Sequence, residues 1–348
     1  MISYLLKKIG YALLTIFGVV TVIFFMFSVL PGDPAQMMLG QNQSEEQIQQ
    51  VKQKYGFDQP VLTQYFYYLN DLSPLSIHKN NPKHYTTLES GKYQATHLFE
   101  TSNYTFALKT PYLRESFQQS GRSVGSVIAE TLPNTAILAI SAITIALGIG
   151  IILGIFSAIF KDTFLDKSIQ ILSTLGMSLP SFFSAILFAW FFAFVLKDLT
   201  GLNMTGNLYE LDDFGEKRHL ILKNLILPAV VLGIRPLAVV SQLMRNALLE
   251  QLQEDYIRTA RAKGLSEFRI IYKHALKNAL NPVITAISGW FASMLAGAVF
   301  VEYIFGWNGL GKEIVNALET LDLPIIMGAV LIIALMFIII NIFVDIIY

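Results

Sequence analysis

The sequence predicts an all-α integral membrane protein with six transmembrane helices, and three observations carry this prediction. Of the 348 residues, 53% are hydrophobic and 14% are charged, whereas an ordinary soluble domain carries about 25% charged residues. Six long runs contain almost no charge, and about 20 such residues in a helix cross the hydrocarbon core of a bilayer. Lys and Arg gather in alternate connections between the runs, as expected for a multi-pass protein.

Each apolar run is interpreted as one helix, because in lipid a helix satisfies its own backbone polar groups within a single segment. The runs are 9–32, 131–160, 168–196, 224–244, 278–301 and 323–344. A cleaved signal peptide over the first run is disfavoured, since its apolar stretch exceeds the roughly 7–15 residues of a signal peptide. Small residues in "ALGIGIILGIFSA" and "GWFASMLAGAVF" would let helices approach closely.

The distribution of basic residues orients the chain with its N-terminus in the cytoplasm. The short connections on that side would be 1–8, 161–167 and about 248–277, which carry most of the Lys and Arg residues of the short loops. Three regions follow from this orientation. They are 1–32 with the first helix, an extracytoplasmic segment 33–126, and a membrane domain 127–348 that contains a cytoplasmic loop 248–281.

The extracytoplasmic segment shows local signals for short helices. Asp33 followed by Pro34 predicts a helix start, and Ser44 with Gln47 predicts a capping box. Gly56 predicts the end of that helix. The aromatic stretch "QYFYYL" is interpreted as an interfacial belt of tyrosines. Residues 71–112 are polar and predict an extracytoplasmic loop or small lobe to which no chemistry is assigned.

The composition disfavours several classes of protein. The net charge is zero, so nothing indicates a nucleic-acid partner. The chain has no cysteine, and its five histidines form no close ligand pair, so no metal site, cofactor or catalytic residue is predicted. The stretch "GWNGLGKE" resembles a phosphate-binding loop, but Glu313 stands where Mg²⁺ binding requires Ser or Thr. We therefore expect the chain not to be an enzyme.

Arg235 is the single charge inside the fourth run. A charge at that depth costs roughly 3 kcal/mol on insertion scales, so it should face protein or water. Two interpretations stay open. In the first, Arg235 lines a path for substrate, where it could meet a peptide carboxylate. In the second, its role is structural: it pairs with a carbonyl or acid on a neighbouring helix, or it forms part of a kink with Pro236.

The cytoplasmic loop predicts two short helices that meet at Gly264. The first spans about 248–263, Gly264 ends it, and Ser266 caps the second. Asn281–Pro282 should break the second helix before the fifth run. One apolar stripe and one basic stripe are expected on the second helix. The apolar stripe consists of Phe268, Ile271, Tyr272, Ala275, Leu276 and Ala279. The basic stripe consists of Arg269, Lys273 and Lys277.

Two interpretations of this loop are possible on the pattern alone. An amphipathic hairpin could lie on the inner leaflet with its basic stripe toward lipid headgroups. Alternatively, the small residues and tight turn of "YIRTARAKGLS" would let another backbone approach closely, which suits docking of a cytoplasmic partner.

The loop sequence "DYIRTARAKGLSEFRIIYKHALKNALNPVI" resembles the Glu-Ala-Ala-x-x-x-Gly loop of permeases of ATP-binding-cassette importers. Arg258, Thr259 and Ala260 fall on the three lettered positions, with Arg258 departing from the usual Glu, and Gly264 falls on the glycine. The stretches "LPGDP", "GFDQPVLTQY", "VEYIFGWNGLG" and "NIFVDIIY" are similar to the LPGDP-bearing permease subunit of dipeptide, oligopeptide and nickel transporters. Residues 71–112 are not matched by this resemblance. Such permeases usually continue beyond the position of Tyr348, which leaves open whether the sequence is truncated there.

The resemblance implies a type I importer permease fold in a bacterial inner membrane and a peptide substrate. It further implies a second homologous permease, two cytoplasmic ATP-binding subunits and an external substrate-binding protein as partners, besides membrane lipid. The ATP-binding subunits would contact Tyr256, Arg258, Thr259, Ala260, Arg261, Lys263, Gly264 and Leu265. Nickel or a metal chelate as substrate, and an ion-coupled secondary transporter, are the alternatives.

Overall fold

The computed structural model describes residues 2–28, 33–39, 44–82, 84–119, 121–212 and 217–347. Most of these residues are helical, as predicted. The chain divides into two compact units. The first comprises Met1–Glu130 and Glu313–Leu335, and the second comprises Thr131–Lys312 and Met336–Tyr348. Pro31 and Gly32, at the end of the first predicted run, lie outside the described residues.

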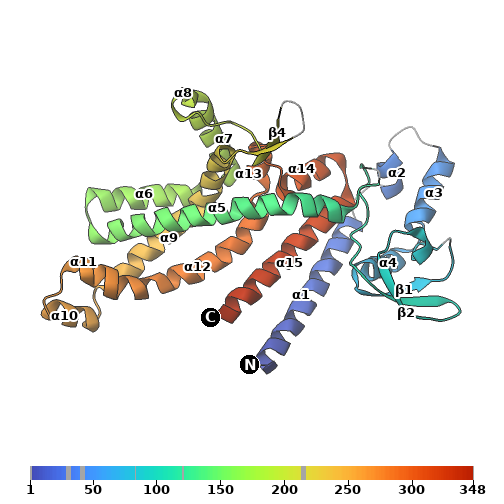
Figure 1. Cartoon of the computed structure of the whole chain (residues 1–348), viewed down its shortest axis with the longest axis horizontal. Helices are drawn as coiled ribbons and strands as arrows, with labels where there is room; N and C mark the ends of the chain where they lie inside the picture. The colour runs from blue at the N-terminus through green and yellow to red at the C-terminus, as the bar shows by residue number, and fades with distance from the viewer. Residues whose placement is uncertain are drawn as a thin grey trace. The chain divides into compact units, whose positions relative to one another are not determined.

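The first unit contains four N-terminal helices and a small sheet (Figure 1). Its elements before residue 124 are α1 (Ile2–Ser28), α2 (Pro34–Leu39), α3 (Glu45–Tyr55), α4 (Val61–Leu72), β1 (Leu75–Lys79), η1 (Leu88–Ser90), β2 (Ala95–Glu100) and β3 (Tyr104–Lys109). The local signals of the sequence are confirmed here. Ser44 and Gln47 form the capping box of α3, and Gly56 ends that helix with φ 73°.

The segment 71–112 contains a three-stranded antiparallel sheet in the order β1-β3-β2, so the prediction of an entirely α-helical chain is wrong there. The alternation along β1 is inverted relative to an ordinary amphipathic strand. Ser76 and His78 are buried, while Leu75 and Ile77 are exposed. His78 links its Nε2 to Ser76 at 2.8 Å and its Nδ1 to the Thr86 carbonyl at 2.7 Å. The strand therefore alternates with period two, but its polar residues, which satisfy one another, lie on the buried face, so a hydrophobicity pattern would predict the wrong face as buried.

Asp71 is the centre of the same lobe. It is fully buried and accepts hydrogen bonds from the hydroxyls of Tyr85 at 2.6 Å and Tyr93 at 2.7 Å. Arg114 donates its Nε to the same carboxylate at 3.1 Å. Burial raises the pKa of Tyr85 well above its ordinary value, so this hydroxyl stays a donor. A buried carboxylate with this many donors is stably held.

The tyrosines of α4 do not form the predicted interfacial belt. Tyr65 and Tyr68 are buried against α1, where their rings lie 5.3 and 5.6 Å from that of Phe24. The Tyr65 hydroxyl also contacts Thr21 at 2.6 Å. Phe66, on the opposite side of α4, stays exposed. The stretch therefore fixes α4 to α1.

The second unit holds most of the long apolar helices. The remaining elements of the chain are α5 (Val124–Ile159), α6 (Phe164–Ser178), α7 (Ser181–Trp190), η2 (Phe191–Val195), α8 (Lys197–Thr200), β4 (Tyr209–Leu211), β5 (Arg218–Leu220), α9 (Lys223–Gln251), α10 (Asp255–Ala262), α11 (Glu267–Arg269), η3 (Ile270–Ala275), α12 (Leu276–Gly297), α13 (Val299–Ile304), α14 (Leu310–Thr320) and α15 (Leu323–Ile347). Strands β4 and β5 form a short antiparallel ribbon, a second departure from an all-α fold.

Within the described residues, four helices are long and apolar enough to cross a membrane: Lys7–Ser28, Val124–Ile159, Lys223–Gln251 and Leu323–Val344. A fifth candidate is the bent pair formed by Phe164–Ser178 and Ser181–Val195, whose axes differ by 112°. The run 168–196, which is predicted as one helix, is divided into two helices. Leu179 precedes Pro180 and is extended at φ −76° and ψ 133°, because proline disfavours helical geometry in the residue before it.

Small residues bring α5 and α9 into close contact, as the sequence predicts. A Cβ on Gly154 would lie 2.6 Å from the Ser241 carbonyl, and one on Gly150 would lie 2.9 Å from that of Leu237. Across the same pair of helices, a Cβ on Gly233 would lie 2.8 Å from the Ala142 carbonyl. Such separations are too short for any side chain, so these glycines are what lets the two backbones meet.

Candidate functional site

The loop between α9 and α12 is a compact helical turn and not an extended linker. Helix α10 ends in a Schellman arrangement. The Gly264 N–H donates to the Arg261 carbonyl at 2.9 Å, and the Leu265 N–H donates to the Ala260 carbonyl at 3.3 Å. Gly264 adopts φ +75°, and a Cβ there would meet nothing within 4 Å. The predicted role of Gly264 as the residue that ends the first helix is confirmed.

Most of the residues that the resemblance assigns to ATPase contact are on the surface of this turn. Tyr256, Arg258, Thr259, Arg261, Lys263 and Gly264 are exposed. Ala260 is buried, and Leu265 is half-buried against the same cluster. The first six residues can therefore be touched by another protein, while Ala260 and Leu265 hold the turn in place.

Buried apolar residues attach the loop to the long helices. Ile257 and Ala260 of α10 pack with Ile270 and Ala275 of the following turn in one cluster. The same cluster contains Val240, Met244 and Leu248 of α9 and Ala279 and Val283 of α12. A rigid connection of this kind would carry a displacement of the loop to α12 and to α9, which is long and apolar enough to span a membrane.

The predicted apolar stripe of the second loop helix is partly wrong. Phe268 and Tyr272, which the pattern places on the buried side, are 79% and 69% exposed and stack on each other with ring centroids 6.1 Å apart. Ile270 is fully buried instead. Residues Ile270–Ala275 form a π-helical turn, and the wider turn shifts the buried face relative to an ideal α-helix. Helix α12 also continues through Pro282, so the predicted break there is wrong.

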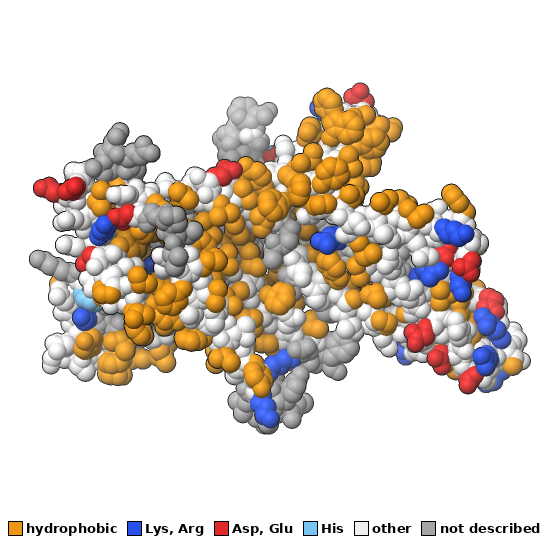
Figure 2. Space-filling model, turned by 180° about the vertical axis from the view of Figure 1, so that it is seen from behind, with side chains coloured by type: hydrophobic (Ala, Val, Ile, Leu, Met, Phe, Trp, Pro, Cys, Tyr) orange, Lys and Arg blue, Asp and Glu red, His pale blue; other side chains and the backbone are white. Residues whose placement is uncertain are grey.

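The surface of the loop is rich in charge, in contrast to the neighbouring helices (Figure 2). Arg261 spans the Gly264 turn to pair with Glu267, Nε to Oε1, at 2.8 Å. Arg258 pairs with Asp255 at 3.2 Å. Ser266 begins the second helix with extended backbone but makes no side-chain cap. Both ion pairs are exposed, so each stabilises the fold by at most about 1 kcal/mol and is free to reorganise on contact with a partner.

A buried ion pair lies near the C-terminal end of α9. Arg245 donates from Nε to Asp166 Oδ1 at 2.8 Å and from Nη2 to Oδ2 at 2.7 Å. The side chains of Arg245 and Asp166 are 14% and 1% exposed. Asp166 also accepts from the Asp162 N–H at 2.9 Å and from Gln170 at 2.9 Å. This bidentate pair fixes the start of α6 to α9 six residues before α9 ends at Gln251.

Arg235 is exposed on α9 and lines a cavity of about 160 Å³. The lining includes three hydroxyl groups and one indole, those of Ser181, Ser184, Ser293 and Trp290. Among the described residues, no acid or carbonyl accepts a hydrogen bond from its guanidinium. The interpretation of Arg235 as a partner of a group on a neighbouring helix is therefore not supported, whereas its place on the wall of a cavity suits a lining residue.

In the stretch that resembles a phosphate-binding loop, a carboxyl group of the same chain, that of Glu302, occupies the place of a phosphate. The Glu302 carboxylate is fully buried, and its Oε2 accepts from the N–H groups of Gly311 at 2.7 Å and Lys312 at 3.2 Å. These N–H groups belong to the first turn of α14, where a phosphate would bind in a true phosphate loop. A Cβ on Gly309 would overlap this carboxylate. Burial raises the pKa of Glu302 to about 7, against the opposing effect of the two N–H groups.

Two of these features differ in how far local sequence could reveal them. Asp166 and Arg245 lie 79 positions apart, and no motif links them. Glu302 could have been suspected from the glycines at 309 and 311, since such spacing leaves room for a buried group. No group of three or more metal-ligating side chains occurs among the described residues.

Comparisons with known proteins identify the family of this chain. The family described as binding-protein-dependent transport system inner membrane component matches residues 150–348. Its N-terminal membrane component matches residues 1–77. The di/tripeptide transport system permease protein DppB of Pseudomonas aeruginosa is 31% identical over 365 residues, covering 100% of this chain and 97% of the relative. The dipeptide transport system permease protein DppB of Alkalihalophilus pseudofirmus is 30% identical over 361 residues, with the same coverage. The chain therefore belongs to the family of inner membrane components of binding-protein-dependent transport systems.

Proposed function

We propose that the chain is the membrane-spanning permease subunit of an ATP-binding-cassette importer for dipeptides and oligopeptides. The observation that carries this proposal is its relatedness, over the whole chain, to two permeases named for dipeptide or tripeptide transport. Both names favour peptides over nickel or a metal chelate as substrate, and the family favours an ATP-driven importer over an ion-coupled transporter.

In this proposal the chain is a type I importer permease with six spans and a cytoplasmic N-terminus. A second, homologous permease, two ATP-binding subunits and an external binding protein complete the transporter. The exposed surface of α10 and the Gly264 turn would dock on an ATP-binding subunit. The buried cluster around Ile257 and Ile270 supports this role, because it joins the loop to α9 and α12 without a flexible link.

Arg235 is proposed to line the translocation path and to pair transiently with a peptide carboxylate. Two observations support the role. Its guanidinium has no acceptor among the described residues, and it faces a cavity with serine hydroxyls and an indole ring. A guanidinium binds a carboxylate with two parallel hydrogen bonds. The serine hydroxyls would donate hydrogen bonds to the peptide backbone or accept them from it.

Replacing Arg235 tests this function. In a reconstituted transporter with its binding protein, Arg235→Gln is expected to reduce ATP-driven uptake of a labelled dipeptide about tenfold or more. A hydrogen bond to a charged group contributes about 1.5–3 kcal/mol, and about 1.4 kcal/mol is tenfold. Assembly and basal ATP hydrolysis should be unchanged, and Arg235→Lys should retain part of the uptake.

The control is Arg218→Gln, which removes an exposed arginine of β5 outside the candidate spans and should leave uptake unchanged. Normal uptake by Arg235→Gln would remove Arg235 from the path, and failed assembly would show a structural role instead. Absence of peptide uptake by the unmodified transporter would contradict the proposed function itself, separately from the role of Arg235.

A further inference from the structure

The first unit contains a second cavity, of about 160 Å³. It lies between the C-terminal end of α1, near Ser28, and the N-terminal end of α15. Its walls are mainly aromatic and aliphatic side chains, among them Phe24, Phe27, Leu113, Phe117 and Met327. Its volume is close to the roughly 150 Å³ of an engineered apolar cavity that binds benzene. The cavity can therefore hold a body of about six carbon atoms.

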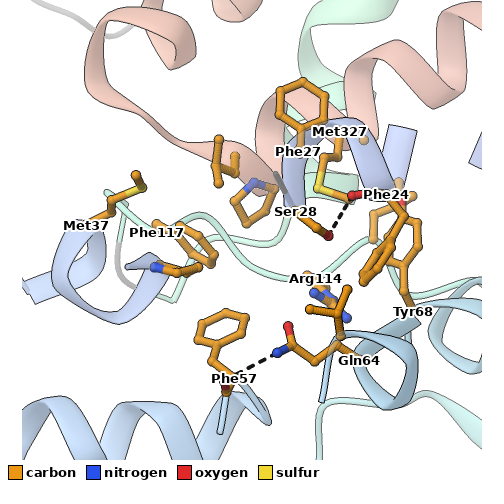
Figure 3. A pocket seen from close by; sticks show the side chains of 16 residues that line it. Phe24, Phe27, Ser28, Met37, Phe57, Gln64, Tyr68, Arg114, Phe117 and Met327 are labelled. Atoms are coloured by element: carbon orange, nitrogen blue, oxygen red, sulfur yellow. Dashed lines mark hydrogen bonds between the residues drawn. The ribbon is translucent and has the colours of Figure 1, made fainter. Parts of the chain in front are cut away.

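One cation faces this apolar space. In Figure 3 the Arg114 side chain lies near the middle of the labelled residues, close to Gln64 and between Ser28 and Phe57. Its Nε donates to Asp71 at 3.1 Å, and its guanidinium lies 5.2 Å from the centre of the Tyr68 ring. An arginine has five N–H donors, and among the described residues no acceptor is recorded for those on its two terminal nitrogens.

Asp71 positions this guanidinium without using its terminal nitrogens. The carboxylate is already bonded to the hydroxyls of Tyr85 and Tyr93, and Lys109 donates to the Asp71 carbonyl. The cluster thus orients Arg114 through its Nε and leaves the two terminal nitrogens for a second anion. Planar N–H pairs of this kind bind phosphate and carboxylate groups in two-point fashion.

The position of the cavity along α1 and α15 identifies the class of ligand. Both helices are long and apolar enough to span a membrane, and the cavity lies at one end of each span. At that level a bilayer presents phosphate groups next to the first carbons of acyl chains. In the proposed orientation this is the outer leaflet. The chemistry on the wall, one free guanidinium edge beside an apolar volume, matches that boundary.

We propose that this cavity is a phospholipid site, in which Arg114 binds the phosphate of an anionic phospholipid and the apolar wall encloses the first carbons of an acyl chain. The site would tie the extracytoplasmic lobe that holds Asp71 to the bilayer beside α1 and α15. It depends on these two helices being spans but not on the identity of the transported substrate.

The test fills the cavity without touching Arg114. The full-length chain, with the subunits that co-purify, is incubated in a non-ionic detergent with phosphatidylglycerol, and bound lipids are counted by native mass spectrometry. Val61→Trp places an indole at the wall and should reduce retention of one phosphatidylglycerol at least tenfold. Its matched control is Leu62→Trp, the next residue of α4, which is exposed and does not line the cavity. That control should retain lipid like the unmodified chain.

Two further arms separate the sources of the ligand. Diacylglycerol with the same acyl chains lacks the phosphate and should be retained at least tenfold less than phosphatidylglycerol. Oleate should not displace phosphatidylglycerol. A second filling variant, Ser28→Phe at the end of α1, should reproduce the loss and serves if Val61→Trp does not fold. Equal retention by the filling variants and the control, equal retention of diacylglycerol, or displacement by oleate would each overturn the proposal.

Discussion

Gly264→Asp is expected to abolish ATP-driven peptide uptake while the chain still inserts into the membrane. Gly264 has φ +75°, and a residue with a Cβ pays roughly 1–2 kcal/mol in that conformation. The loop is held by its buried cluster, so this strain alone should not unfold it. The added side chain would project from the exposed turn without touching the rest of this chain. In the assembled transporter it would collide with the surface of any subunit docked there. We therefore expect the ATP-binding subunits to be lost on purification.

A matched control separates docking from backbone strain. Gly91 has φ +70°, and a Cβ there would likewise meet nothing within 4 Å, but it ends η1 in the lobe formed by residues 71–112. Gly91→Asp imposes the same strain and charge away from the loop, and uptake should be close to that of the unmodified transporter. Full uptake by Gly264→Asp, or an equal loss in both variants, would contradict a docking role for Gly264.

Arg245→Met should produce the largest loss of stability among single changes in the loop region. It leaves the Asp166 carboxylate, which is 1% exposed, without its cation, and breaking a buried pair in this way costs roughly 3–5 kcal/mol. Because the pair joins α6 to α9 next to the loop, assembly with ATP-binding subunits should fail as well. The thermal unfolding midpoint of the purified chain in detergent, read by size-exclusion chromatography after heating, measures the effect.

Arg122→Met provides the comparison for that loss. Arg122 pairs with Glu130, but their side chains are 39% and 60% exposed, so the pair should contribute at most about 1 kcal/mol. The double change Asp166→Asn with Arg245→Met removes both charges and should recover part of the stability, because no uncompensated charge is left buried. An unfolding midpoint for Arg245→Met within the range of Arg122→Met would show that the Asp166 pair does not hold these helices.

Features with a local signal could be predicted from sequence. The long apolar helices, the capping box at Ser44, the helix end at Gly264 and the close approach at Gly154 each depend on a few neighbouring residues or on glycine itself. The motif assigned eight residues of the turn to contact with a partner, of which six are exposed, whereas Ala260 is buried and Leu265 is half-buried. Such features depend little on distant parts of the chain, so a pattern of hydrophobicity and turn residues is enough to place them.

The features that sequence analysis missed depend on contacts between distant residues. Pro180 indicates a helix start or a kink, but the 112° between the two helices that it separates cannot be predicted from hydrophobicity. The π-helical turn at Ile270–Ala275 is wider than an α-helical turn, and this rotates the buried face so that Phe268 and Tyr272 lie at the surface. The sheet in the lobe buries Ser76 and His78 because Thr86 and neighbouring groups satisfy them, and Asp71 gathers donors from three separate segments.

Site-specific cross-linking from the loop tests the central claim most directly. The chain has no native cysteine, so Lys263→Cys carries a thiol-reactive photo-cross-linker at one known position on the exposed turn. In membranes that contain the whole transporter, illumination is predicted to link this position to an ATP-binding subunit, identified by mass spectrometry. Lys273→Cys, on the basic stripe, should link much less to that subunit. Cross-linking of Lys263→Cys to lipid alone would show that the loop lies on the membrane surface and would contradict its role as the contact that transmits ATP-driven movement.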